Sequence, residues 1–79
     1  MGTKNNPGQY DCYAKAEPDE PMFVLLARDK LAPALVLAWA MEQKRLIDEG
    51  RRPAEEIDKV GEAMACAHNM IAWQRRNRP

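Results

Sequence analysis

The chain has 79 residues, of which 46% are hydrophobic and 30% are charged, a balance typical of a globular domain rather than of a disordered segment. Twelve basic residues match twelve acidic ones, so the net charge is zero, which argues against a nucleic-acid-binding protein that relies on clustered positive charge. The two cysteines are too few for a disulfide-rich secreted scaffold.

The first residues of the chain predict a flexible arm. Residues 1–9 are rich in Gly, Asn and Pro, and the first 20 residues contain no apolar stretch of the signal-peptide kind. The uninterrupted apolar run over residues 34–41 is far short of the roughly 20 residues that span a bilayer. We therefore expect a cytoplasmic protein without membrane contact.

The next segment, residues 17–29, places acids and prolines against an apolar stretch and ends in Arg28 and Asp29. Asp19 and Glu20 can cap a helix whose first turn accepts Pro21, so we expect a short helix over residues 19–28. A short apolar run of this kind is not distinguished from a buried strand by periodicity. Because the segment must bury its middle and hold charges at both ends, it is the best candidate for a functional surface.

The second predicted helix covers residues 30–48. Asp29 is its expected N-cap, Pro33 falls in the first turn, where no intrahelical donor is lost, and Gly50 is the expected stop signal. At about 100° per residue, one apolar stripe of this helix consists of Leu31, Leu35, Ala38, Trp39 and Leu46. Glu42 falls within this stripe, so we expect a partly buried carboxylate with Arg28 or Arg75 as its partner.

The third predicted helix covers residues 53–76. Pro53 occupies its first position, and two glutamates follow in the positive first turn. Its main apolar stripe consists of Ile57, Val60, Met64, Ala67 and Ile71. A second apolar side consists of Ala63, Cys66, Met70 and Trp73.

These elements predict an all-α fold in which an antiparallel helical hairpin is joined to a short N-terminal helix. The whole chain, residues 1–79, forms one small three-helix domain with a thin core. If the two stripes close the hairpin, one further apolar surface remains on each helix. We expect the N-terminal segment to cover one surface and a second copy of the chain to cover the other, which predicts a homo-oligomer, most simply a dimer.

Few residues are suited to metal binding or nucleophilic catalysis. The soft ligands are Cys12, Cys66 and His68. Cys66 and His68 are two positions apart on the third predicted helix, so their side chains point about 160° away from each other and are poorly placed to bind one ion. No phosphate-binding loop, nucleophile elbow or metalloprotease motif is present. We therefore expect no metal, no cofactor and no enzymatic activity; Cys12 and Cys66 are two buried thiols or, in an oxidising setting, a disulfide.

Two groups of residues are candidates for binding. Glu17, Asp19 and Glu20, beside Arg28 and Asp29, can bind a polar ligand or a basic loop of a partner, although helix capping and solvation explain the same acids. Arginines can clamp phosphates bidentately while an aromatic ring stacks on the ligand. The candidates for this role are Arg28, Arg51, Arg52, Arg75 and Arg76, with Tyr10, Tyr13 or Trp73 for stacking; Arg78 extends the basic C-terminus.

Parts of the sequence resemble a group of short uncharacterised bacterial and phage or prophage proteins. The resemblance rests on residues 10–13, on residues 16–29 with their motif AEPDEPMFVLLARD, and on residues 32–40. Residues 62–70 and Trp73 fit the same pattern. The resemblance covers about two thirds of the chain and implies no catalytic residues; a phage context favours a small protein that acts on a host factor.

The sequence thus predicts a non-enzymatic helical interaction protein that binds a host protein, and the resemblance implies a phage origin. The alternative is a binder that sequesters a small anionic ligand such as a nucleotide. A nucleic-acid accessory protein that uses the basic C-terminus is less favoured, and an enzyme is the least favoured class.

Overall fold

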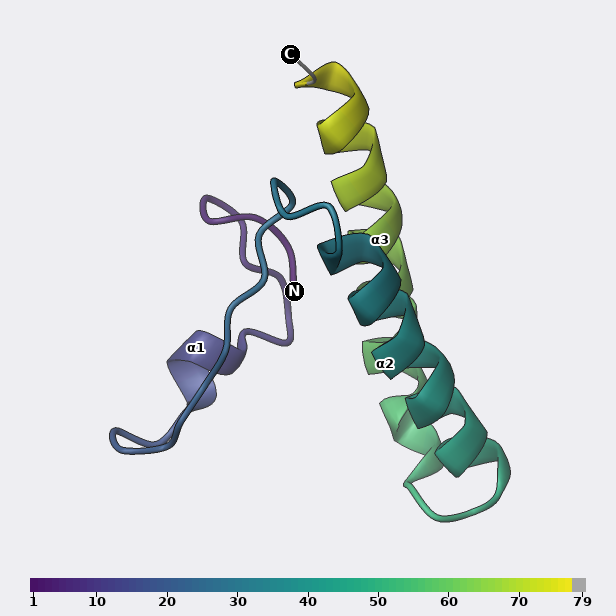
Figure 1. The fold of residues 1–79 in the computed structure, drawn as a ribbon. Helices are drawn as coiled ribbons and strands as arrows, with labels where there is room; N and C mark the ends of the chain where they lie inside the picture. The colour runs from purple at the N-terminus through teal and green to yellow at the C-terminus, as the bar shows by residue number, and fades with distance from the viewer. Residues whose placement is uncertain (78–79) are drawn as a thin grey trace.

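Two long antiparallel helices form the body of the molecule, and the N-terminal third of the chain lies along one side of them (Figure 1). The structure, a computed structural model, describes residues 1–77. Its helices are α1 (Cys12–Lys15), α2 (Ala32–Asp48), the 3-10 helix η1 (Ala54–Glu56) and α3 (Ile57–Arg76). No strand occurs within residues 1–77, so the expected all-α fold with a helical hairpin is confirmed.

A tight turn after α2 reverses the chain and makes the hairpin antiparallel. Gly50 has a φ of 74°, the left-handed conformation that glycine adopts without steric cost. The N–H of Gly50 donates to Ile47 O (3.0 Å), and the N–H of Arg51 donates to Leu46 O (2.9 Å). These two bonds form a Schellman motif, which satisfies carbonyl groups at the end of α2. The expected stop at Gly50 is therefore confirmed.

The two long helices touch through alanines. Ala32 and Ala40 of α2 and Ala63 and Ala67 of α3 are completely buried, and Val60 is 3% exposed. Side chains of this size let two helix backbones approach closely. No side chain larger than these is fully buried within the described residues, so the core is small, as expected for a chain of this length.

The stripe that we expected to close the hairpin on α2 lies elsewhere. Leu31, Leu35 and Trp39 are 67%, 50% and 40% exposed, whereas the contact with α3 uses the face that carries Ala32 and Ala40. The front half of α2 is apolar all round, so its hydrophobic pattern does not select one face. The contact is made where the small side chains on both helices permit the closest approach.

The expectation for α3 is correct in part. Val60 and Ala67 belong to the buried contact as predicted. Ile57 and Met64, which we had placed in the same stripe, are 43% and 38% exposed. Ala63, assigned to the second apolar side, is fully buried and replaces them. The face of α3 that contacts α2 therefore differs from the predicted stripe and lies on the side of the helix that carries its buried alanines.

The helix expected over residues 19–28 is absent. Residues 20–26 are extended between two turns (Figure 1). The short N-terminal helix is instead α1. At its start, the Asp11 carboxylate accepts a hydrogen bond from the N–H of Tyr13 (3.1 Å). Glu20 does not cap a helix, because its carboxylate accepts from the N–H of Glu17 (3.0 Å) across a turn. Pro21 also disfavours the helical conformation at the residue that precedes it.

Both long helices begin slightly later than expected. Asp29 is not the N-cap of α2; its carboxylate accepts from the N–H of Leu31 (2.9 Å) and its carbonyl accepts from the N–H of Ala32 (3.0 Å), forming a turn just before the helix. Pro53 precedes η1 as its N-cap, and α3 follows from Ile57 to Arg76.

The N-terminal arm, expected to be flexible, makes specific contacts with α3. The amino group of Met1 donates to Tyr10 O (2.7 Å) and lies 3.2 Å from the Glu62 carboxylate. The N–H of Tyr10 donates to the same carboxylate oxygen of Glu62 (3.4 Å). The Met1 side chain packs against the cluster formed by Ala40, Val60 and Ala63. Glu62 therefore holds both ends of the loop formed by residues 1–10.

The partner expected for Glu42 was wrong. Its carboxylate is exposed and bonds to Arg45, one turn further along α2, rather than to Arg28 or Arg75. This hydrogen bond lowers the pKa of Glu42 below its ordinary value, and the paired carboxylates of Glu42 and Glu49 raise the pKa of Arg45. An i,i+3 pair on the surface of one helix needs no partner from elsewhere in the fold.

We predict that the alanine contact tolerates no larger side chain. Ala63→Leu should lower the free energy of unfolding by about 1–3 kcal/mol, because extra methylene groups there force the two helices apart. Ala65→Leu, at an exposed position of the same helix, should change it by less than about 0.5 kcal/mol. Urea unfolding followed by circular dichroism at one protein concentration measures both; equal midpoints would contradict the alanine contact.

Candidate binding surfaces

One glutamine of α3 anchors the end of the segment that the sequence singled out. The Nε2 group of Gln74 donates to Ala27 O (2.8 Å) and to Asp29 O (3.0 Å). Both acceptors are backbone carbonyls immediately before α2. The bonds therefore tie residues 27–31, which we call the linker, to the C-terminal half of α3. Sequence reasoning missed Gln74, although it continues the buried i, i+3, i+4 spacing of Val60, Ala63 and Ala67 along α3 and is itself half-buried.

The segment before this anchor presents apolar side chains to solvent. We call residues 22–26 the apolar segment; Phe23 is 85% exposed, and Met22, Val24 and Leu26 are 48%, 60% and 52% exposed. Backbone groups of residues 21–25 make no hydrogen bond with any described residue. A segment outside any helix or sheet, with free backbone groups and exposed apolar side chains, can pair with another chain in the way that an unpaired sheet edge does.

The predicted acidic residues come together at the start of the apolar segment. Glu17 and Glu20 are joined across a turn by a hydrogen bond from the N–H of Glu20 to Glu17 O (3.1 Å), in addition to the side-chain bond already described. Asp19 lies between them, and all three carboxylates are exposed. The acids form a charged turn beside the apolar segment and do not stabilise a helix.

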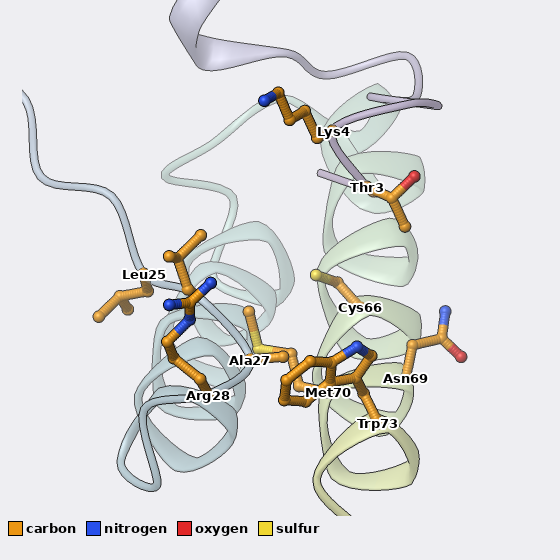
Figure 2. A pocket seen from close by; sticks show the side chains of 11 residues that line it. Thr3, Lys4, Leu25, Ala27, Arg28, Cys66, Asn69, Met70 and Trp73 are labelled. Carbon is orange, nitrogen blue, oxygen red and sulfur yellow. The ribbon is translucent and has the colours of Figure 1, made fainter. Parts of the chain in front are cut away.

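A cavity of about 320 Å³ lies between the arm, the linker and α3 (Figure 2). Its α3 wall consists of Cys66, Asn69, Met70 and Trp73, and the facing wall carries Leu25 to Arg28. In Figure 2 the Met70 and Trp73 side chains extend from α3 towards the linker. This wall is mainly apolar, so the second apolar side predicted for α3 is the side that the N-terminal segment lies against.

The exposed flank of α2 lies on this same side of the hairpin. The Lys59 ammonium of α3 is 5.6 Å from the centroid of the Trp39 ring, which places Trp39 on the side of α3 that carries Lys59. Cys66, Met70 and Trp73 continue that side of α3 at helical spacing. The apolar segment and the α2 flank formed by Leu31, Leu35 and Trp39 therefore belong to one side of the molecule, the arm side.

A second cavity, of about 650 Å³, brings together basic residues from two parts of the chain. Arg28 and Lys30 come from the linker, and Arg75 comes from the last turn of α3. Trp73 lines the same cavity, together with Ile71, Gln74 and Asn77. The structure thus unites Arg28 and Arg75, two predicted binding residues, with the aromatic ring predicted to stack on a ligand.

Other predicted binding residues are not part of this arrangement. Tyr13 lies on α1 and is 77% exposed, Arg76 is exposed at the end of α3, and neither lines this cavity. Arg51 and Arg52 lie at the turn between the helices, at the other end of the hairpin, where they pair with Glu49 and Glu56. Arg78 lies outside the described residues.

The metal-ligating side chains stay apart. Among residues 1–77, no group of three or more His, Cys, Asp or Glu side chains could hold a metal ion. Cys12 is exposed rather than buried as expected, Cys66 is half-buried, and both are free thiols. In the same part of the chain, no helix combines the length and the apolar character needed to cross a membrane.

Comparison with protein-family models, with curated proteins and with solved structures found no match for this chain.

We predict that Gln74 controls how firmly the linker is held. Gln74→Glu keeps the shape of the side chain but removes the donor and sets a carboxylate beside two carbonyl oxygens. Loss of the two hydrogen bonds should lower the free energy of opening the linker by about 1–3 kcal/mol. Hydrogen exchange at residues 27–32 measures this.

The matched control for this variant is Gln9→Glu, which makes the same chemical change at an exposed position of the N-terminal arm. It should leave exchange in the linker unchanged. Equal exchange in Gln74→Glu and the wild type would show that the two bonds do not anchor the linker.

Proposed function

We propose that this protein is a non-enzymatic interaction protein that binds a host protein through the apolar segment, residues 22–26. The observation that carries the proposal is the exposure of Phe23, 85%, in an extended segment whose far end is anchored to α3. A large exposed aromatic in an ordered position is the kind of residue that dominates the binding energy of protein interfaces. Because the anchor already orders one end, binding costs less conformational entropy than it would for a free peptide.

The chemistry of the segment defines the partner. Its free backbone groups fit the exposed edge of a sheet, where an added strand gains main-chain hydrogen bonds and its side chains enter pockets. The acidic turn formed by Glu17, Asp19 and Glu20 fits basic residues beside that edge. We therefore propose a partner that offers a sheet edge, an apolar pocket for Phe23 and an adjacent basic patch. The resemblance to phage and prophage proteins favours a bacterial host protein, bound in the cytoplasm.

The proposal predicts that Phe23→Asp abolishes capture of the partner. The tagged wild-type protein is used to capture proteins from a bacterial lysate, and the captured protein is then purified and titrated calorimetrically. Loss of an aromatic anchor of about 2 kcal/mol or more raises the Kd by about 30-fold or more. Because the Phe23 side chain is almost entirely exposed, the variant should keep the helical content of the wild type.

Ala65→Asp, which adds the same charge at an exposed position of α3, should bind the purified partner like the wild type. If both variants bind equally well, or if no purified host protein binds, the proposed role of the apolar segment is wrong.

The basic cavity supports a second candidate function, binding of a small anionic ligand such as a nucleotide. Arg28, Lys30 and Arg75 converge on it, and the Trp73 ring offers a surface on which a base can stack. Arg75 also stabilises the negative C-terminal end of α3, which explains its position without any ligand. This role is therefore second to the interaction through the apolar segment.

A thermal-shift titration with pyrophosphate and with nucleotides tests this candidate. A ligand that binds only the folded state adds about 2.7 kcal/mol at 100 times its Kd, which raises the Tm by about 10 °C or more in a domain of this size. Arg28→Gln and Arg75→Gln should remove the shift, and Arg51→Gln, at the other end of the hairpin, should preserve it. The absence of a shift with every anion would exclude this function.

A further inference from the structure

The side of the hairpin that faces away from the arm is also apolar. Residues two apart on a helix point about 160° away from each other. On α3, Ile57, Met64 and Ile71 are each two positions from Lys59, Cys66 and Trp73, which mark the arm side. On α2, Leu37 and Met41 are each two positions from Trp39. We call the surface formed by Leu37, Met41, Ile57, Met64 and Ile71 the far side.

The described residues leave most of the far side uncovered; Ile71, near the C-terminal end of α3, lines the basic cavity together with Arg28 and Lys30. Met41, Ile57 and Met64 are 66%, 43% and 38% exposed, and Leu37 and Ile71 are half-buried. The arm contacts the opposite side through Glu62 and the cavity wall already described. The hairpin therefore has one side covered in part by its own N-terminal segment and one side that residues 1–77 leave largely open.

The exposed area of the chain matches the needs of a dimer. A compact monomer of 9.0 kDa exposes about 4,900 Å². This chain exposes 6436 Å², an excess of about 1,600 Å². Permanent homodimers bury about 1,000–2,500 Å² on each subunit. The excess belongs to the whole chain, the N-terminal segment included, and half of it, about 800 Å², equals the share of one subunit in an interface of standard size.

Gly61 adds an independent observation. It lies in the interior of α3, four residues after Ile57 and three before Met64, so it belongs to the far side. Apart from its chain neighbours and the backbone of α3 itself, no described atom lies within 4 Å of the position that a Cβ would occupy there. Glycine weakens a helix interior relative to alanine, and no contact among residues 1–77 requires it at this position. Close approach of a helix from another molecule supplies a reason, because a glycine lets two backbones come together.

We propose that a second copy of this chain covers the far side, forming a symmetric four-helix bundle in which α3 crosses its symmetry mate at Gly61. Two identical surfaces can pair about a two-fold axis, which closes the assembly at two subunits. Identical copies with a net charge of zero do not repel each other. Met41 and Met64 are flexible enough to fit together at such a contact. This assembly leaves the apolar segment on the arm side free, so it does not depend on the proposed function.

Sedimentation velocity across a concentration series tests the dimer on the full chain. The wild type should sediment as a dimer, and Met64→Glu, which places an unpaired charge in the interface, should raise the dimer Kd by about 100-fold or more. Gly61→Lys should have the same effect while keeping or raising the helical content, because its side chain has open space in the single subunit. Met22→Glu, an equivalent change on the arm side, should leave the dimer intact.

Three results would overturn the proposal. A monomeric wild type at the highest soluble concentration would exclude the dimer. A dimer that is broken by Met22→Glu and not by Met64→Glu would place the contact on the arm side. A folded Gly61→Lys protein that dimerises like the wild type would exclude the crossing at Gly61.

Discussion

The rest of the structure depends on the contact between the alanines of α2 and α3. Because Ala32, Ala40, Ala63 and Ala67 are small, the two helix backbones come close and the contact holds no large side chain. Val36 and Ile47 of α2 pack against the edge of this contact, and most other large apolar residues of both helices project to the flanks. One flank receives the N-terminal segment, and the other is left to solvent. The two candidate surfaces of this protein are thus a direct result of how closely its helices pack.

Two polar side chains then place the N-terminal third of the chain. The Glu62 carboxylate accepts from the backbone of Tyr10 and lies beside the Met1 amino group, and the Gln74 amide donates to the carbonyls of Ala27 and Asp29. Between these anchors the chain contributes little to the core. Most of its apolar side chains remain outside, where they are available to another molecule. The buried contact and the exposed apolar side chains thus lie in different parts of a short chain.

The all-α class and the hairpin could be predicted from the sequence because Gly50, Pro53 and the 3.6-residue periodicity act locally. The face that closes the hairpin could not, since α2 is apolar all round and only the pairing with α3 selects Ala40 over Leu35. Residues 19–28 were wrongly assigned because an acid before a proline can cap a helix or close a turn, and the bond between Glu17 and Glu20 decides between them. The meeting of Arg28 with Arg75 depends on the Gln74 anchor; helical spacing places Gln74 on the buried face of α3 but does not identify the distant carbonyls that it binds.

The bonds made by Gln74 have a consequence for how this protein can change over time. They hold main-chain carbonyls, which every amino acid possesses, so the anchor is indifferent to which side chains occupy the preceding positions. Residues 22–26 can therefore accumulate substitutions without disturbing the hairpin that carries them. Under the proposed function, such a scaffold separates inheritance of the fold from inheritance of binding preference, and one hairpin can serve a lineage whose targets differ.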